Sequence, residues 1–180
     1  MRGLLRRLRG VPELKTRRLR LVAMTPEMLE ADAASEGRLA TLLKARVPAA
    51  WPPAEWELHV LATIFANATA KPESMGWHRY TLMPDRLGRR TLVGCVGGFP
   101  RGDGVVEIGY STLPGFQRKG YGTEAAGALV EYLLEQEGVR AVTAQTFASM
   151  AESIKVMERC GMVFAGEGDD PGTVRYRRER

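Results

Sequence analysis

The chain has 180 residues, 44% of them hydrophobic and 26% charged, and its formal net charge is +5. This composition is typical of one globular domain, and no apolar run approaches the roughly 20 residues that a membrane-spanning helix needs. The only cysteines are Cys95 and Cys160, so we expect neither a disulfide framework nor a metal site, and we expect a cytoplasmic protein.

The positive charge is concentrated at the N-terminus. Residues 1–20 carry eight cations and one acid, so the other 160 residues together carry a net charge of −2. We interpret residues 1–13 as a basic arm and residues 14–180 as the folded domain. The arm is either a solvated tail or a contact to nucleic acid, the ribosome or acidic lipid. For the domain we expect no nucleic-acid or membrane partner, and a homodimer stays open.

The first third of the chain mixes strand and helix patterns. Alternating apolar and charged residues predict a strand over 17–24, and Thr25 followed by Pro26 predicts that a helix begins near residue 26. A weaker helical pattern covers 36–46. After a proline-rich loop, helical spacing of apolar residues predicts a helix over 54–68.

Strand patterns dominate the middle of the chain. Short turns separate three predicted strands, which we interpret as an antiparallel meander. A helix, a strand, a second helix and a closing hairpin follow, which implies one right-handed crossover. The predicted fold is therefore α/β, a single domain with a mixed, mostly antiparallel central sheet flanked by helices. The predicted strands span 76–83, 91–99, 105–113 and 139–147, the helices 123–138 and 149–161, and the hairpin 162–178.

The segment "GFQRKGYGTEA" at 115–125 has the composition of a phosphate-binding loop. It lies between a predicted strand and a predicted helix, whose first N–H groups lack internal partners and favour an anion. It is not a nucleotide P-loop, because Tyr121 and Gly122 stand where that loop needs a lysine and a hydroxyl. A dinucleotide fingerprint also fails, because the following strand ends without an acidic residue for the ribose. The other interpretation is a tight turn that only starts the helix.

The loop resembles the signature [QR]-x-x-G-x-[GA] of the Gcn5-related N-acetyltransferases (GNAT), through Gln117, Gly120 and Gly122. The segment "ESIKVMERCGMVFAGE", which begins at Glu152, is similar to a second conserved segment of that family. The opening "LKTRRLRLVAMTPEM" resembles the subgroup that includes ribosomal-protein N-terminal (RimJ/RimL-like) acetyltransferases. The resemblance covers roughly residues 14–178.

The resemblance implies acetyl-CoA as co-substrate. The pyrophosphate would lie on the backbone amides of 118–123, and the pantetheine arm would lie between two splayed strands, 105–113 and 139–147. Met150 stands where the family often has an asparagine that contacts pantetheine. The residues expected to bind acetyl-CoA are Ile108, Ser111, Thr112, Leu113, Gln117, Arg118, Lys119, Gly120, Tyr121, Gly122, Thr123 and Ser153.

The expected reaction moves an acetyl group to a primary amine, on a protein N-terminus or a small molecule, by direct attack on the thioester. We expect Glu107 to act as the base. Ser153 could bind the cofactor sulfur or relay a proton to it, and Tyr110 could act as the acid. Each has a structural alternative: a solvent-facing strand residue, a helix cap and a packed tyrosine.

Trp51, Trp56 and His78 are candidates for the wall of the acceptor pocket, because the resemblance places the acceptor on that side and aromatic side chains line many ligand sites. All three could instead be core residues. The rival function is a non-catalytic CoA-binding sensor or interaction protein.

Overall fold

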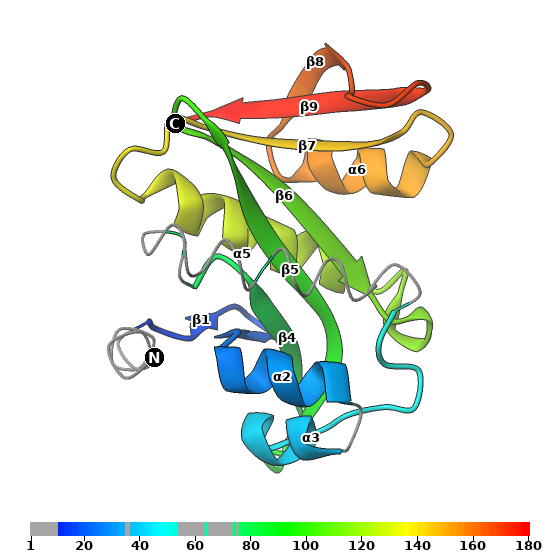
Figure 1. Cartoon of the computed structure of the whole chain (residues 1–180). Coiled ribbons are helices and arrows are strands. Elements are labelled where there is room, and N and C mark those ends of the chain that lie inside the picture. Colours follow the sequence, from blue (N-terminus) through cyan, green and yellow to red (C-terminus); the bar gives the residue numbers. More distant parts are fainter. Residues whose placement is uncertain (1–10, 35–36, 54–63, 65–73, 75) are drawn as a thin grey trace.

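The computed structural model describes residues 11–34, 37–53, 64, 74 and 76–180 (Figure 1). The predicted helix over 54–68 lies almost entirely outside the described residues. In the described part, the chain forms β1 (Leu14–Lys15), β2 (Arg20–Ala23), α2 (Pro26–Ala34), α3 (Arg38–Leu43), β3 (Ala45–Arg46), β4 (Arg79–Pro84), β5 (Arg90–Gly102), β6 (Val105–Thr112), η2 (Pro114–Phe116), α5 (Tyr121–Leu134), β7 (Ala141–Phe147), α6 (Ala151–Arg159), β8 (Val163–Glu167) and β9 (Thr173–Glu179).

The described strands form one mixed sheet in the order β1-β2-β4-β5-β6-β7-β9-β8, and β3 adds to β5. Neighbouring strands run antiparallel except at β6 with β7 and at β3 with β5. This confirms the predicted α/β class, the meander of β4, β5 and β6, and the closing hairpin of β8 and β9.

The sheet carries helices on both faces, as the alternation of side chains along β4 shows. Arg79 reaches Tyr132 of α5 on one face, whereas the next residue, Tyr80, belongs to the core under α2 and α3 on the other. The amphipathic helix α5 buries its apolar face against the sheet, as its spacing predicts, and Figure 1 shows it lying across the strands. The buried positions are Ala125, Ala126, Leu129, Val130, Leu133 and Leu134.

The parallel strands β6 and β7 pair only over a short stretch. Val105 to Glu107 face Ala141 to Thr143, and no further pairing of these two strands is found among the described residues, although both continue, to Thr112 and Phe147. Figure 1 shows the two strands diverging from this point, with α6 alongside β7. Backbone groups of β6 beyond Glu107 therefore lack a strand partner on that edge. This opening positions the site described below.

Candidate functional site

A groove of about 890 Å³ occupies the space where β6 and β7 separate. Its walls come from β6, the loop that begins α5, the end of β7 and the groove-facing side of α6. Many of the expected cofactor residues meet there, although they are far apart in the sequence. The lining residues that the sequence predicted are Ile108, Tyr110, Ser111, Thr112, Gln117, Arg118, Gly120, Gly122, Thr123 and Ser153.

Three expected cofactor residues do not line the groove. Leu113 is 1% exposed in the core, and its backbone N–H donates to the carbonyl of Val93 at 2.9 Å. Lys119 donates from Nζ to the carbonyl of Gly115 at 3.0 Å. Tyr121 lies under the guanidinium of Arg18, 4.5 Å from the ring centre. Any contact of these residues with a cofactor stays a prediction.

The loop before α5 presents an open helix N-terminus to the groove. Gly120 is the N-cap residue, with a φ of 78°, and no side chain in the described part of the chain caps the helix. The left-handed conformation suits glycine, and the first N–H groups of α5 lack intrahelical acceptors. Together with the helix dipole and the Arg118 side chain, they favour a bound anion at this end of the groove.

An ion pair between Arg18 and Glu124 holds this loop against the start of the domain. The Glu124 carboxylate, in the first turn of α5, accepts hydrogen bonds from Thr16 Oγ1 (2.5 Å), Arg18 N (2.7 Å) and Arg18 Nε (2.7 Å). Arg18 also donates from Nη1 to the carbonyl of Lys119 at 2.9 Å. Burial would raise the pKa of Glu124, but the hydrogen bonds from Thr16 and Arg18 outweigh it and lower that pKa. Arg18 and Glu124 thus tie the loop to the start of the domain.

The sequence did not single out the cations on the opposite wall. Lys155 and Arg159 lie one helical turn apart on α6, and both line the groove. Their i, i+4 spacing indicates that they share a helix face, but the sequence does not show that this face lines a groove. Gln145, Thr146 and Glu152 line the same wall. Met150 also lines it and is 53% exposed, so a thioether occupies the position where the family often has an asparagine.

Tyr110 and Ser153 meet across the groove. The Tyr110 hydroxyl lies 3.0 Å from Ser153 Oγ and donates to the Ser153 carbonyl, also at 3.0 Å. Burial raises the pKa of Tyr110 to about 12, although the hydrogen bond with Ser153 lowers it. The phenol therefore keeps its proton at neutral pH, and the pair can donate a proton or a hydrogen bond into the groove.

Glu107 lies at the last paired position of β6 and β7, outside the lining of the groove and of the cavity described next. Its carboxylate accepts from Arg101 at 2.5 Å and from Gln145 Nε2 at 3.1 Å. The structure therefore gives this carboxylate two protein partners that the sequence did not predict. Its role as a base stays a prediction.

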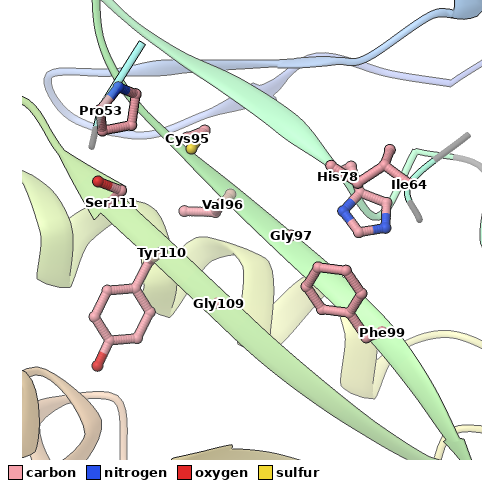
Figure 2. A pocket seen from close by; sticks show the side chains of 10 residues that line it. All are labelled: Pro53, Ile64, His78, Cys95, Val96, Gly97, Phe99, Gly109, Tyr110 and Ser111. Carbon is pink, nitrogen blue, oxygen red and sulfur yellow. The ribbon is translucent and has the colours of Figure 1, made fainter. Parts of the chain in front are cut away.

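A smaller cavity of about 230 Å³ borders the groove at Gly109–Ser111 of β6 (Figure 2). His78, predicted for the acceptor pocket, lines this cavity together with Pro53, Ile64, Cys95, Val96, Gly97 and Phe99. Trp51 does not line it. Its indole donates to the buried Asp32 at 2.7 Å and packs edge-on against Tyr80 in the core under α2 and α3. Trp56 lies outside the described residues.

Two further observations concern the described residues alone. They contain no group of three or more side chains that could hold a metal ion. None of their helices is long and apolar enough to span a membrane.

Comparison with known proteins places the chain in a family. The family model described as "Acetyltransferase (GNAT) domain" matches residues 18–163. A curated relative, the uncharacterized N-acetyltransferase YjdG of Bacillus subtilis (strain 168), is 36% identical over 74 residues. That match covers 40% of this chain and 44% of the relative, so it spans less than half the length of the curated protein.

Solved structures share the fold at low sequence identity. An acetyltransferase from Agrobacterium tumefaciens str. C58 aligns with a TM-score of 0.63 and 20% identity, over 95% of this chain and 96% of that one. The ribosomal L7/L12 alpha-N-protein acetyltransferase RimL, solved with coenzyme A, aligns with a TM-score of 0.60 and 16% identity, over 94% and 97%. The microcin C7 self-immunity acetyltransferase MccE, solved with acetyl-CoA and AMP, aligns with a TM-score of 0.59 and 13% identity. This alignment covers 92% of this chain and 94% of MccE. The family model matches most of this chain, and the splayed strands and the open helix N-terminus agree with that match. The chain therefore belongs to the GNAT acetyltransferases.

Proposed function

We propose that this protein is an acetyl-CoA-dependent N-acetyltransferase that acts on a primary amine. The observation that carries the proposal is the meeting of two spaces at one short backbone segment, Gly109–Ser111. On one side lies a long groove whose helix N-terminus favours an anion, and on the other lies a small cavity that would hold the acceptor. A cofactor and an acceptor held in these two spaces would meet at β6.

The groove has the features that acetyl-CoA requires. Its phosphates would lie against the amides that begin α5 and against Arg118, with Lys155 and Arg159 as further cations on the opposite wall. The extended arm would bond to the edge of β6 that β7 leaves free beyond Glu107. The backbone donors belong to α5 and β6, so they are held in place before the cofactor binds, which favours binding without a large rearrangement.

Acetyl-CoA supplies the acetyl group already activated as a thioester. The acceptor nitrogen forms the new bond to the acetyl carbon, the carbon–sulfur bond breaks, and the sulfur leaves with the electron pair. Tyr110 or Ser153, whose hydroxyl oxygens lie 3.0 Å apart, would return a proton to that sulfur. Free N–H groups of β6 would stabilise the oxyanion. No covalent enzyme intermediate is required, and Glu107 stays our candidate for removing the proton from the amine.

The acceptor is proposed here only as a primary amine, on a protein N-terminus or on a small molecule. RimL, as its name states, acetylates the N-terminus of ribosomal L7/L12, and at 16% identity it supports the fold and not that substrate. A cytoplasmic location, a metal-free reaction and a homodimer stay predictions.

The test is a turnover assay in which release of the free CoA thiol is followed with a panel of amines. We expect release above background only when an acceptor is present, with the acetylated amine found by mass spectrometry. The rival hypothesis, a non-catalytic CoA sensor, predicts that acetyl-CoA binds and that no amine in the panel is acetylated.

A further inference from the structure

The floor of the small cavity is bare backbone. Gly97 of β5 faces Gly109 of β6 across the antiparallel ladder, and neither brings a side chain. A Cβ added at Gly109 would meet only Phe99 Cε2, at 3.8 Å, so this position has room. The described side chains around the floor are mostly apolar and include Ile64 and Val96. The cavity is therefore a small apolar space beside the proposed point of reaction.

The imidazole of His78 faces this apolar space. His78 is 4% exposed, and neither of its ring nitrogens has a hydrogen-bond partner among the described residues. The ring packs edge-on against Phe99, with 4.8 Å between the ring centres, and Figure 2 shows the two rings side by side at the cavity. Buried polar atoms without partners are rare in folded proteins and cost free energy. An unpartnered imidazole on a cavity wall therefore points to a ligand.

The sheet is shaped to admit this ring. A Cβ added at Gly97 would lie 2.4 Å from His78 Nδ1, so any larger residue at that position would displace the imidazole. Met24, which follows β2, fixes the backbone of His78, because its N–H donates to the His78 carbonyl at 2.9 Å. The backbone of His78 is thus held by Met24, and the missing side chain at Gly97 leaves the space that the ring fills.

The charge of the cavity wall restricts the ligand. The titratable groups among its described lining residues are His78, Cys95 and Tyr110, and no carboxylate is among them. The neighbouring Arg79 points to the opposite face of β4, where it lies over Tyr132. Burial lowers the pKa of His78 to about 4, so the imidazole is neutral at physiological pH. A second or third positive charge on an acceptor would find no described partner here, and burying an unpaired charge is costly.

We propose that His78 orients the acceptor amine by accepting a hydrogen bond from its nitrogen, and that the cavity selects acceptors with one primary amine on a compact apolar frame. Polyamines and aminoglycosides are thereby disfavoured. The frame is either a small free amine or the apolar first residue of a peptide, since the cavity chemistry is the same for both. This inference rests on the proposed N-acetyltransferase function.

The experiment compares kcat/KM for isoamylamine, phenethylamine, spermidine and two short peptides, one beginning with an apolar residue and one with lysine. We expect the monoamines or the apolar peptide to exceed spermidine and the lysine peptide by at least about tenfold. Faster turnover of the free monoamines would identify a small-molecule acceptor, and faster turnover of the apolar peptide would identify a protein N-terminus. Equal or better turnover of spermidine would overturn the inference.

Two variants at position 78 test the hydrogen bond. His78→Phe should lower kcat/KM for the preferred amine by about tenfold, because it removes the acceptor atom and keeps a ring. His78→Gln, which keeps a hydrogen-bond acceptor, should recover part of that loss. Thermal unfolding is measured for each variant to check that it is folded. If His78→Phe keeps the wild-type KM and kcat for the amine, His78 does not orient it.

A third variant tests the cavity without touching His78. Gly109→Val fills the floor and should raise KM for phenethylamine more than for methylamine. Calorimetric titration with acetyl-CoA is run on every variant, and we expect unchanged affinity for the two His78 variants. Wild-type protein that binds acetyl-CoA and acetylates all amines alike refutes only this inference. Wild-type protein that acetylates no amine refutes the proposed function, and the inference falls with it.

Discussion

The ion pair between Arg18 and Glu124 leads to a quantitative prediction for the variant Glu124→Gln. The Glu124 carboxylate accepts three hydrogen bonds from Thr16 and Arg18, at 2.5 to 2.7 Å. A glutamine keeps one carbonyl oxygen, but it has no charge, and its NH₂ group would face donors instead of accepting from them. Hydrogen bonds to charged groups contribute about 1.5–3 kcal/mol each, and this pair is partly exposed. We therefore expect the free energy of unfolding to fall by about 2 kcal/mol.

The control is Glu131→Gln on the same helix. The Glu131 carboxylate pairs with Arg178 at 2.7 Å, but its side chain is 61% exposed, compared with 16% for Glu124. Exposed pairs contribute about 0–1 kcal/mol, so the control should barely change stability. The assay is urea unfolding of all three proteins. Equal midpoints for the two variants would refute the reasoning.

The pH dependence has a definite sign. The pKa of Glu124 is lowered in the folded protein, so its contribution is present above the unfolded pKa of 4.5 and is lost as the pH falls through the folded value. The difference in unfolding free energy between wild type and Glu124→Gln should therefore shrink below pH 4.5. A difference that stays constant between pH 7 and pH 3 would contradict this assignment.

Three further predictions concern other parts of the site and core. Trp51→Phe should lower the unfolding free energy by about 2 kcal/mol, because the hydrogen bond to Asp32 is lost, and should leave KM for the amine unchanged. A large increase in KM would instead indicate that Trp51 contributes to the acceptor pocket. Tyr110→Phe should lower kcat by about tenfold or more while the acetyl-CoA Kd stays the same, because it removes the proton donor beside Ser153; unchanged kcat would dismiss that role. Cys160, whose pKa burial raises to about 11, should react with iodoacetamide at pH 8 only after unfolding, as peptide mapping would show.

Much of the fold was predictable because the signals were local and strong. The turns between β4, β5 and β6 and the apolar spacing of α5 each follow from a few neighbouring residues. The two-residue strands β1 and β3 were missed, because two residues carry no periodicity. Boundaries also shifted: the helix predicted over 123–138 begins at Tyr121 and ends at Leu134.

The candidate site was predictable where it follows one loop and unpredictable where it depends on packing between distant segments. Gln117, Gly120 and Gly122 could be identified because they match the loop signature of the family, and they line the groove. Glu107 is bonded to Arg101 and Gln145, which come from two other strands. The sequence around Glu107 therefore could not predict these partners.

The central claim is that the groove binds acetyl-CoA, and calorimetric titration tests it most directly. Wild type, Arg118→Glu and Arg86→Glu would be compared, the last as an equal charge reversal at an exposed turn away from the groove. We predict micromolar binding by wild type and Arg86→Glu and a loss of about tenfold or more for Arg118→Glu, because a charged phosphate contact is reversed. Folded wild-type protein that gives no binding heat at several temperatures, or equal affinity for all three proteins, would contradict the account.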